Sequence, residues 1–174
     1  MKKNPKVLIT KDQIENRILQ LADLIRQDYA GKRLLLICIL KGSFIFTADL
    51  VRCLHMPVEI DFIRVSSYGT GEESSGKVEV TQDIGIPIEG REVLLVEDIV
   101  DTGLSLAFLL DFLNQRGPAS IKICALLDKP SRRKSRVHID YLGFNVPDRF
   151  VVGYGIDHAE EYRWLPDVCY LTDD

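Results

Sequence analysis

The strongest constraint on the fold is an almost continuous apolar segment at residues 33–40, RLLLICIL. A strand that is apolar on both faces must be covered on both sides, which is typical of a parallel sheet with helices on each face. Two further strands of this kind are expected at 92–98, EVLLVED, and at 120–128, SIKICALLD. The chain is therefore predicted to fold as α/β around a mostly parallel sheet.

Helical patterns stand between these strands. Thr10 and Gln13 have the spacing of a capping box, and the apolar residues that follow predict an amphipathic helix over 11–29. Further helices are expected at 43–54 and 103–117, and further strands at 58–65, in KVEVTQD after residue 76, and at 149–156. Because there is no linker and no repeat, residues 1–174 are taken as one domain, with a mobile loop at about 66–77.

Composition narrows the class of protein. The net charge of −4 and the pI near 5.4 argue against a nucleic-acid partner. No apolar stretch approaches the ~20 residues of a membrane span, so no membrane partner is expected. The four cysteines form no C-x-x-C pair, and Cys38 and Cys124 lie in apolar runs as core residues would. A reducing cytoplasm is the expected location.

Polar residues follow the predicted strands, at the strand ends where ligands bind in α/β sheets. They are Lys41 and Gly42, Glu97 and Asp98, Lys129, and Asp157. Acidic residues at the end of an apolar strand are unfavourable unless they bind something. Their convergence predicts an enzyme site at this edge of the sheet.

The segment LLVEDIVDTGLSL at 94–106 joins a strand to a helix. The free amide groups of a helix start favour an anion, Gly103 permits close approach, and Thr102 and Ser105 add hydroxyl donors. Residues 101–105 are thus a candidate phosphate cradle: Asp101, Thr102, Gly103, Leu104 and Ser105. The segment matches neither nucleotide-binding glycine motif, so a nucleoside triphosphate or dinucleotide is not indicated.

Glu97 and Asp98 would repel a phosphate, but carboxylates accept hydrogen bonds from the vicinal hydroxyls of a ribose. An acidic pair beside a phosphate cradle describes a ribose 5-phosphate unit. The alternative is that Asp101 and Thr102 only cap the helix, which leaves Glu97 and Asp98 unexplained.

The same segment resembles the phosphoribosyl diphosphate (PRPP) signature of the type I phosphoribosyltransferases. LKGS (40–43), SSYG (66–69), LLDKPSRR (126–133) and FVVGYGID (150–157) with Arg163 resemble, in order, the bacterial hypoxanthine-guanine members of that family. The resemblance implies a parallel twisted sheet flanked by helices, with a small hood formed by the N- and C-terminal segments.

The activity that the resemblance implies is transfer of 5-phosphoribosyl from PRPP to N9 of hypoxanthine or guanine, in purine salvage. Asp101 would handle a proton near N7 of the base. A homodimer or homotetramer is also implied, and Phe44, Phe46 and Leu50 are apolar residues that an interface could use.

For the pyrophosphate of PRPP, the resemblance points to Lys41, Gly42 and Arg163, sometimes with a cis peptide between Leu40 and Lys41. Without the other motifs, Lys41–Gly42 would read as an ordinary turn. Mg²⁺ is the expected metal, because it binds through one or two carboxylates plus substrate oxygens. Its candidate ligands are Asp157, Glu97 and Asp98, whereas His158 is more simply a surface histidine.

The purine side of the site is assigned to Lys129, Phe150, Val151 and Asp157. Lys129 would donate to the O6 that adenine lacks. Phe150 would stack on the base, although core packing is its alternative role. Arg132 and Arg133 either contact phosphate or only solvate their loop. Ser67 and Tyr68, in the 66–77 loop, suit a lid that excludes water.

Three rivals share part of this pattern. A pyrimidine-type phosphoribosyltransferase that also acts as an RNA attenuator should carry a broad basic face, which the acidic balance disfavours. A non-catalytic regulator that senses PRPP would need a DNA-binding domain, for which no residues are left. A dehydrogenase-like nucleotide binder lacks its glycine motif.

Overall fold

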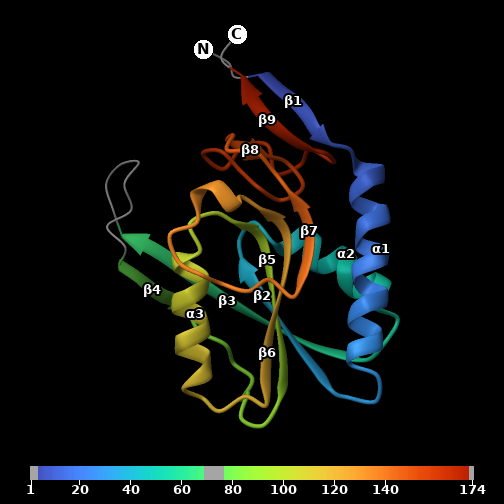
Figure 1. Ribbon diagram of the computed structural model, residues 1–174, viewed down its shortest axis with the longest axis vertical. Helices are drawn as coiled ribbons and strands as arrows, with labels where there is room; N and C mark the ends of the chain where they lie inside the picture. The colour runs from blue at the N-terminus through green and yellow to red at the C-terminus, as the bar shows by residue number, and fades with distance from the viewer. Residues whose placement is uncertain (1–3, 69–76, 173–174) are drawn as a thin grey trace.

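A six-stranded sheet forms the centre of the protein, shown by a computed structural model that describes residues 4–68 and 77–172 (Figure 1). The strand order is β4-β3-β2-β5-β6-β7, and every neighbouring pair is parallel except β3 and β4. The strands are β2 (Leu34–Leu40), β3 (Val58–Tyr68), β4 (Lys77–Gln82), β5 (Glu92–Val100), β6 (Ser120–Asp128) and β7 (Tyr141–Asn145). The predicted mostly parallel α/β sheet is confirmed.

Helices cover both faces of this sheet, as the apolar strands require. Helices α1 (Lys11–Asp28) and α2 (Phe44–Leu54) pack on one face, and α3 (Leu104–Asn114) packs on the other (Figure 1). Strand β2 divides its side chains between the two cores: Leu34 and Leu36 join the α1–α2 side, whereas Leu35 and Ile37 join the α3 side. This alternation explains why the strand is apolar throughout.

The predicted capping box at the start of α1 is present. The Gln13 amide donates to the Thr10 hydroxyl, and the Thr10 amide donates to the Gln13 side chain at 2.9 Å. Farther along α1, the Arg17 guanidinium donates to the Leu142 carbonyl of β7 at 2.7 Å. The Arg17 contact fixes the helix against the sheet.

A second, antiparallel sheet forms a hood over the main one, at the top of Figure 1. Its order is β1 (Asn4–Ile9), β9 (Val168–Thr172) and β8 (Val151–Val152), so the N- and C-terminal segments lie side by side. The implied hood is therefore confirmed. The strand predicted over 149–156 is wrong in extent, because Gly153, Tyr154 and Gly155 all have positive φ, which ends the strand at Val152.

Other boundaries differ from the predictions. Strand β3 continues to Tyr68 and β4 begins at Lys77, so both ends of the predicted 66–77 loop are strand, and residues 69–76 lie outside the described residues. Strands β1, β7 and β9 and the 3-10 turn η1 (Pro130–Arg132) were not predicted. Phe46 and Leu50 are fully buried, so they are not interface residues, whereas Phe44 is 45% exposed.

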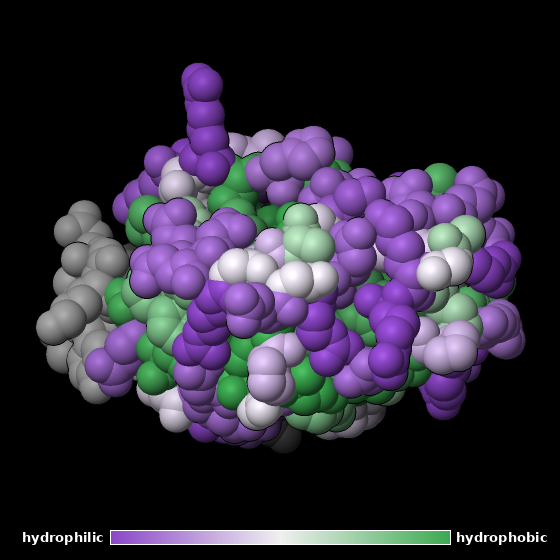
Figure 2. Space-filling model, turned by 90° about the horizontal axis from the view of Figure 1, so that it is seen from below, coloured by the Kyte–Doolittle hydropathy of each residue, from purple (hydrophilic) through white to green (hydrophobic). Residues whose placement is uncertain are grey.

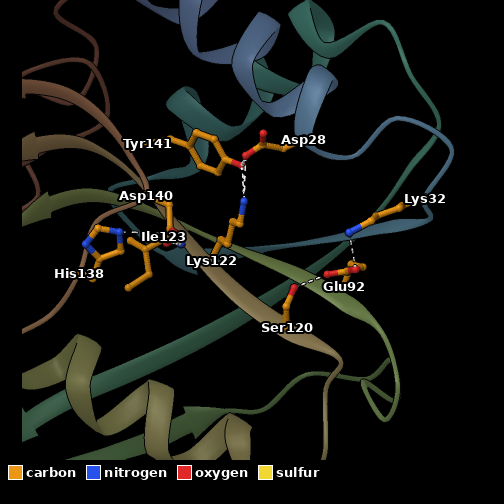
Figure 3. Close-up of polar contacts among 9 residues, drawn as sticks. All are labelled: Asp28, Lys32, Glu92, Ser120, Lys122, Ile123, His138, Asp140 and Tyr141. Atoms are coloured by element: carbon orange, nitrogen blue, oxygen red, sulfur yellow. Dashed lines mark hydrogen bonds and ion pairs between the residues drawn. The ribbon is translucent and has the colours of Figure 1, made fainter.

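A polar network joins the end of α1 to the amino ends of the strands (Figure 3). Lys122 donates to Asp28 at 2.8 Å, and the Tyr141 hydroxyl donates to the same oxygen at 2.5 Å. This pairing lowers the pKa of Asp28. Seen from below, this end of the molecule is mainly hydrophilic, with apolar residues showing between polar ones (Figure 2). Within the described residues, no helix is long and apolar enough to cross a membrane.

Candidate active site

Three segments meet beneath the hood, at the carboxyl ends of the main strands: the end of β5 with the turn after it, the loop after β6, and residues 148–157, which include β8. They enclose a cavity of about 780 Å³. Five residues that were predicted for catalysis or purine binding line it: Asp101, Lys129, Phe150, Val151 and Asp157. Residues that were not assigned to the purine or to catalysis line it too, namely Ile99, Arg132, Asp148, Arg149 and Ile156.

A second, smaller cavity of about 130 Å³ lies at the start of α3 and shares Ile99 and Asp101 with the first. Of the predicted phosphate cradle, Asp101, Thr102, Gly103 and Ser105 line it, together with Glu97. Helix α3 begins at Leu104, after Gly103 in the left-handed conformation (φ 78°). The Leu104 amide donates to the Thr102 hydroxyl at 3.4 Å. The next amides of a helix start lack helical partners, as an anion site requires.

The loop after β6 folds over this turn. The amides of Lys134 and Ser135 both donate to the Thr102 carbonyl, at 2.9 and 3.0 Å. A Cβ on Gly103 would lie 2.8 Å from the Ser135 carbonyl oxygen, which explains why glycine is required. The basic segment 129–136 is thus part of the wall of the site.

Glu97 and Asp98 follow the buried part of β5. The amide of Asp98 donates to Glu97 at 3.1 Å, and the amide of Ile99 donates to Asp98 at 2.8 Å. Surrounding protein and the neighbouring Asp98 charge raise the pKa of Glu97 well above its ordinary value. A Cβ on Gly42 would lie 1.7 Å from Asp98 Oδ2, so the turn after β2 is pressed directly against the acidic pair.

Charged residues of the loop after β6 are paired within the site. Arg132 Nε lies 2.9 Å from Asp101 Oδ1, and its Nη1 lies 3.4 Å from Asp148. Arg133 pairs with Asp128. Neither arginine therefore serves only to solvate its loop.

Lys129 is only 6% exposed, and burial lowers its pKa, while the charges of Asp101 and Asp148 act in the opposite direction. A buried cation that faces a cavity is a strong hydrogen-bond donor for a carbonyl oxygen. The geometry is compatible with the predicted role at a purine O6.

Phe150 is 54% exposed, so core packing does not explain it. The ring of His158 meets it edge-on, with the ring centroids 4.9 Å apart. Val151 is buried in β8. Phe150 and Lys129 both line the larger cavity.

The segment after β8 carries a charged network. Arg163 lies 2.8 Å from Asp157 Oδ1 and 3.1 Å from Glu160 Oε2, and Lys41 lies 2.8 Å from Glu160 Oε1. Lys41 and then Arg163 lower the pKa of Glu160. Glu160 thus brings together Lys41 and Arg163, the two side chains predicted to bind pyrophosphate. Glu160 itself was not among the predicted site residues.

Close backbone packing holds this segment on the turn after β2. A Cβ on Gly155 would lie 2.4 Å from the Gly42 carbonyl oxygen. The peptide bond between Leu40 and Lys41 is cis. The Tyr154 hydroxyl donates to Asp49 of α2. Lys41, Gly42 and the segment of Asp157 and Arg163 therefore form one structural unit.

Two further predictions concern a lid and a metal site. Ser67 and Tyr68 end β3, and the remainder of the proposed lid, 69–76, lies outside the described residues. No group of three or more His, Cys, Asp or Glu side chains that could hold a metal ion is found over residues 4–68 and 77–172. All four cysteines are free.

Comparison with known proteins gives a consistent result. The profile of the phosphoribosyl transferase domain matches residues 9–159. The hypoxanthine phosphoribosyltransferase of Haemophilus influenzae is 48% identical over 91% of this chain and 90% of its own, and the hypoxanthine-guanine phosphoribosyltransferase of Bacillus subtilis is 45% identical over 95% and 92%. A crystal structure of a hypoxanthine-guanine phosphoribosyltransferase from Bacillus anthracis superposes with a TM-score of 0.93 at 45% identity, covering 98% of this chain and 100% of that one. The protein accordingly belongs to the phosphoribosyl transferase family.

Proposed function

We propose that this protein transfers 5-phosphoribosyl from PRPP to N9 of hypoxanthine or guanine, giving IMP or GMP and pyrophosphate in purine salvage. The observation that carries the proposal is the junction of two cavities at Asp101. One contains a buried lysine and an exposed phenylalanine, as a 6-oxopurine would need, and the other lies at the start of α3, as a phosphate would need. The relatives' names support the same activity.

PRPP would lie along the smaller cavity and the acidic pair. The amides and hydroxyls of residues 101–105 would bind its 5′-phosphate, and Glu97 and Asp98 would accept hydrogen bonds from the ribose hydroxyls. Lys41, Gly42 and Arg163 would hold the pyrophosphate. The contact of Gly42 with Asp98 supports this order, because it places the pyrophosphate turn next to the ribose site.

The purine would occupy the larger cavity. Lys129 would donate to O6, Phe150 would stack on the ring, and Val151 and Asp157 would border its far edge. Adenine carries an amino group at this position and would leave the buried cation without an acceptor, so a strong preference for 6-oxopurines is expected.

Asp101 is the proposed proton acceptor at N7, because it is the carboxylate that both cavities share. General-base catalysis by a positioned carboxylate typically contributes about 10²–10⁴-fold to a rate. Arg132, at 2.9 Å, would keep Asp101 oriented toward the base. The segment around Ser67 and Tyr68 is proposed as a lid that keeps water from PRPP.

Metal dependence is expected of this family, and Mg²⁺ is the proposed ion. The donor set fits, since Mg²⁺ usually takes one or two carboxylates and fills its other positions with phosphate oxygens and water. Glu97, Asp98 and Asp157 would hold it together with PRPP. When bound, the ion would neutralise negative charge on the pyrophosphate. Asp157 would have to loosen its contact with Arg163 to do so.

A homodimer or homotetramer is the proposed assembly. Ile60 and Phe62, neighbours on one face of β3, are 38% and 41% exposed and support a contact with a second copy. The cytoplasm is the proposed location, and the free thiols of all four cysteines support a reducing compartment.

The test is a turnover assay with PRPP and Mg²⁺ against hypoxanthine, guanine, xanthine, adenine and uracil, with nucleotide and pyrophosphate both measured. Hypoxanthine and guanine should turn over, EDTA should abolish the reaction, and Asp101→Asn should lower kcat by roughly 10²–10⁴-fold while PRPP still binds. Turnover of uracil in place of the 6-oxopurines would contradict the purine assignments. Binding of PRPP without turnover of any base would instead indicate a PRPP sensor.

A further inference from the structure

One acidic side chain bridges the two cations that are assigned to pyrophosphate. Glu160 Oε1 accepts from Lys41 Nζ at 2.8 Å, and Glu160 Oε2 accepts from Arg163 Nη2 at 3.1 Å. Lys41 comes from the turn after β2, 119 residues earlier in the chain. The two oxygens of one carboxylate thus hold both groups that a bound pyrophosphate would need.

The backbone around Glu160 is unusual. Ala159, Glu160 and Tyr162 have φ of 53°, 64° and 73°, a left-handed conformation that non-glycine residues adopt rarely. Backbone hydrogen bonds between His158 and Glu161 hold the turn, and the Glu160 amide donates to Asp157 at 2.9 Å. Backbone conformations that cost free energy cluster at functional sites, because the function there requires them.

The bridge is also weak enough to be displaced. The Lys41 side chain is 45% exposed and that of Glu160 is 65% exposed, so solvent screens the attraction. Pyrophosphate carries more negative charge than one carboxylate, and arginine binds phosphate with two parallel hydrogen bonds. PRPP would therefore replace Glu160 on both cations.

We propose that Glu160 is an internal substitute for pyrophosphate: in the ligand-free protein its carboxylate occupies the cations of the pyrophosphate site, and it must leave them before PRPP or pyrophosphate binds. This inference rests on the proposed function in one respect, the assignment of Lys41 and Arg163 to pyrophosphate, and does not depend on which base is converted. Its consequence is that Glu160 weakens pyrophosphate binding, although it lies within contact distance of the site.

The test is calorimetric titration of magnesium pyrophosphate into the full-length protein and into Glu160→Gln, which keeps the side-chain size and removes the charge. We expect the variant to bind roughly 3- to 10-fold more tightly at low ionic strength, the range for loss of one or two exposed ion-pair competitors. The difference should shrink at about 1 M salt, where the Debye length is only about 3 Å. Glu160→Asp, which keeps the charge, should stay close to the parent protein.

Glu161→Gln is the matched control, since Glu161 is the exposed neighbour and contacts His158 through its backbone. It should leave pyrophosphate affinity unchanged. Equal or weaker binding by Glu160→Gln would overturn the proposal, as would an equal gain in Glu161→Gln, which would indicate only a general charge effect. The titration measures binding and not turnover. If Glu160→Gln binds pyrophosphate more tightly but the parent protein converts no base, the proposed function is wrong and this inference holds.

Discussion

At the scale of the residue, Lys129 shows how burial sets chemistry. Its side chain faces the site with only 6% of the residue exposed, and burial lowers its pKa against the pull of Asp101 and Asp148. A folded-state pKa below the unfolded one means that the unfolded chain binds more protons between the two values. Stability should therefore rise with pH across that window, whereas the charged form of Lys129, the proposed donor to O6, is lost.

The loss of charge on Lys129 at high pH predicts a pH profile for the reaction. The value of kcat/KM for hypoxanthine should fall on the alkaline side as Lys129 loses its proton, at a pH below that of an ordinary lysine. Lys129→Arg keeps its charge throughout this range. In that variant the part of the alkaline limb due to Lys129 should move to higher pH, even if the maximum rate is lower. Superimposable limbs in the two proteins would rule out Lys129 as the titrating donor.

Much of the residue-level site could be predicted because its members are adjacent in sequence. Glu97, Asp98 and residues 101–105 lie within one short segment at the end of an apolar strand, so this position was enough to select them. Glu160 and Arg132 could not be selected in this way. Their partners Lys41 and Asp101 come from other segments of the chain, and only the fold brings these charges together. The spacing of Asp157, Glu160 and Arg163 at intervals of three was the one local signal.

At the scale of elements, the site depends on the turn after β2 fitting against the end of β5. Gly42→Ala should test this fit, since the new Cβ would lie 1.7 Å from Asp98 Oδ2 and one of the two must move. A displacement of about 1 Å near reacting groups can lower a rate by about 10²-fold. We expect kcat/KM for PRPP to fall roughly 10- to 100-fold, with a loss of stability of about 1–3 kcal/mol, typical of overpacking.

Gly85→Ala is the control for that substitution. Gly85 lies between β4 and β5, and a Cβ there would meet nothing within 4 Å. Steady-state kinetics and thermal unfolding of both variants are the measurements. If Gly42→Ala unfolds at a lower temperature but keeps its PRPP kinetics, the contact is structural and the turn does not set the ribose site.

The elements themselves were predicted unevenly. The central strands and all three helices followed from long apolar periodicity, and the structure has them within a few residues. The strand predicted over 149–156 was too long, because the run RFVVGYGI is apolar for a reason other than strand formation. Tyr154 and Ile156, in the turn that follows β8, are buried as strand residues would be, so burial imitated a strand. Strands β1, β7 and β9 are short and partly polar, and they pair with segments far away in the sequence or at the sheet edge.

At the scale of the whole molecule, one sheet face is left partly uncovered. Within the main sheet, the core beneath α1 and α2 draws its buried strand residues from β2, β5, β6 and β7. Ile60 is in register with Leu36 of β2, so it points to that same face, and Phe62 follows two residues later. Both side chains are exposed to solvent in the single chain.

A second copy of the chain would remove this apolar surface from water. We therefore expect light scattering to give a mass of at least twice 19.7 kDa for the parent protein, and a mass near 19.7 kDa for Phe62→Lys at micromolar concentration. A lysine at the centre of an interface would have to be desolvated without a partner, which opposes association. Leu24→Lys, on α1 with 48% exposure, is the matched control and should keep the parent mass. An unchanged mass in Phe62→Lys would place the contact elsewhere on the molecule, and a monomeric parent protein would remove the proposed assembly altogether.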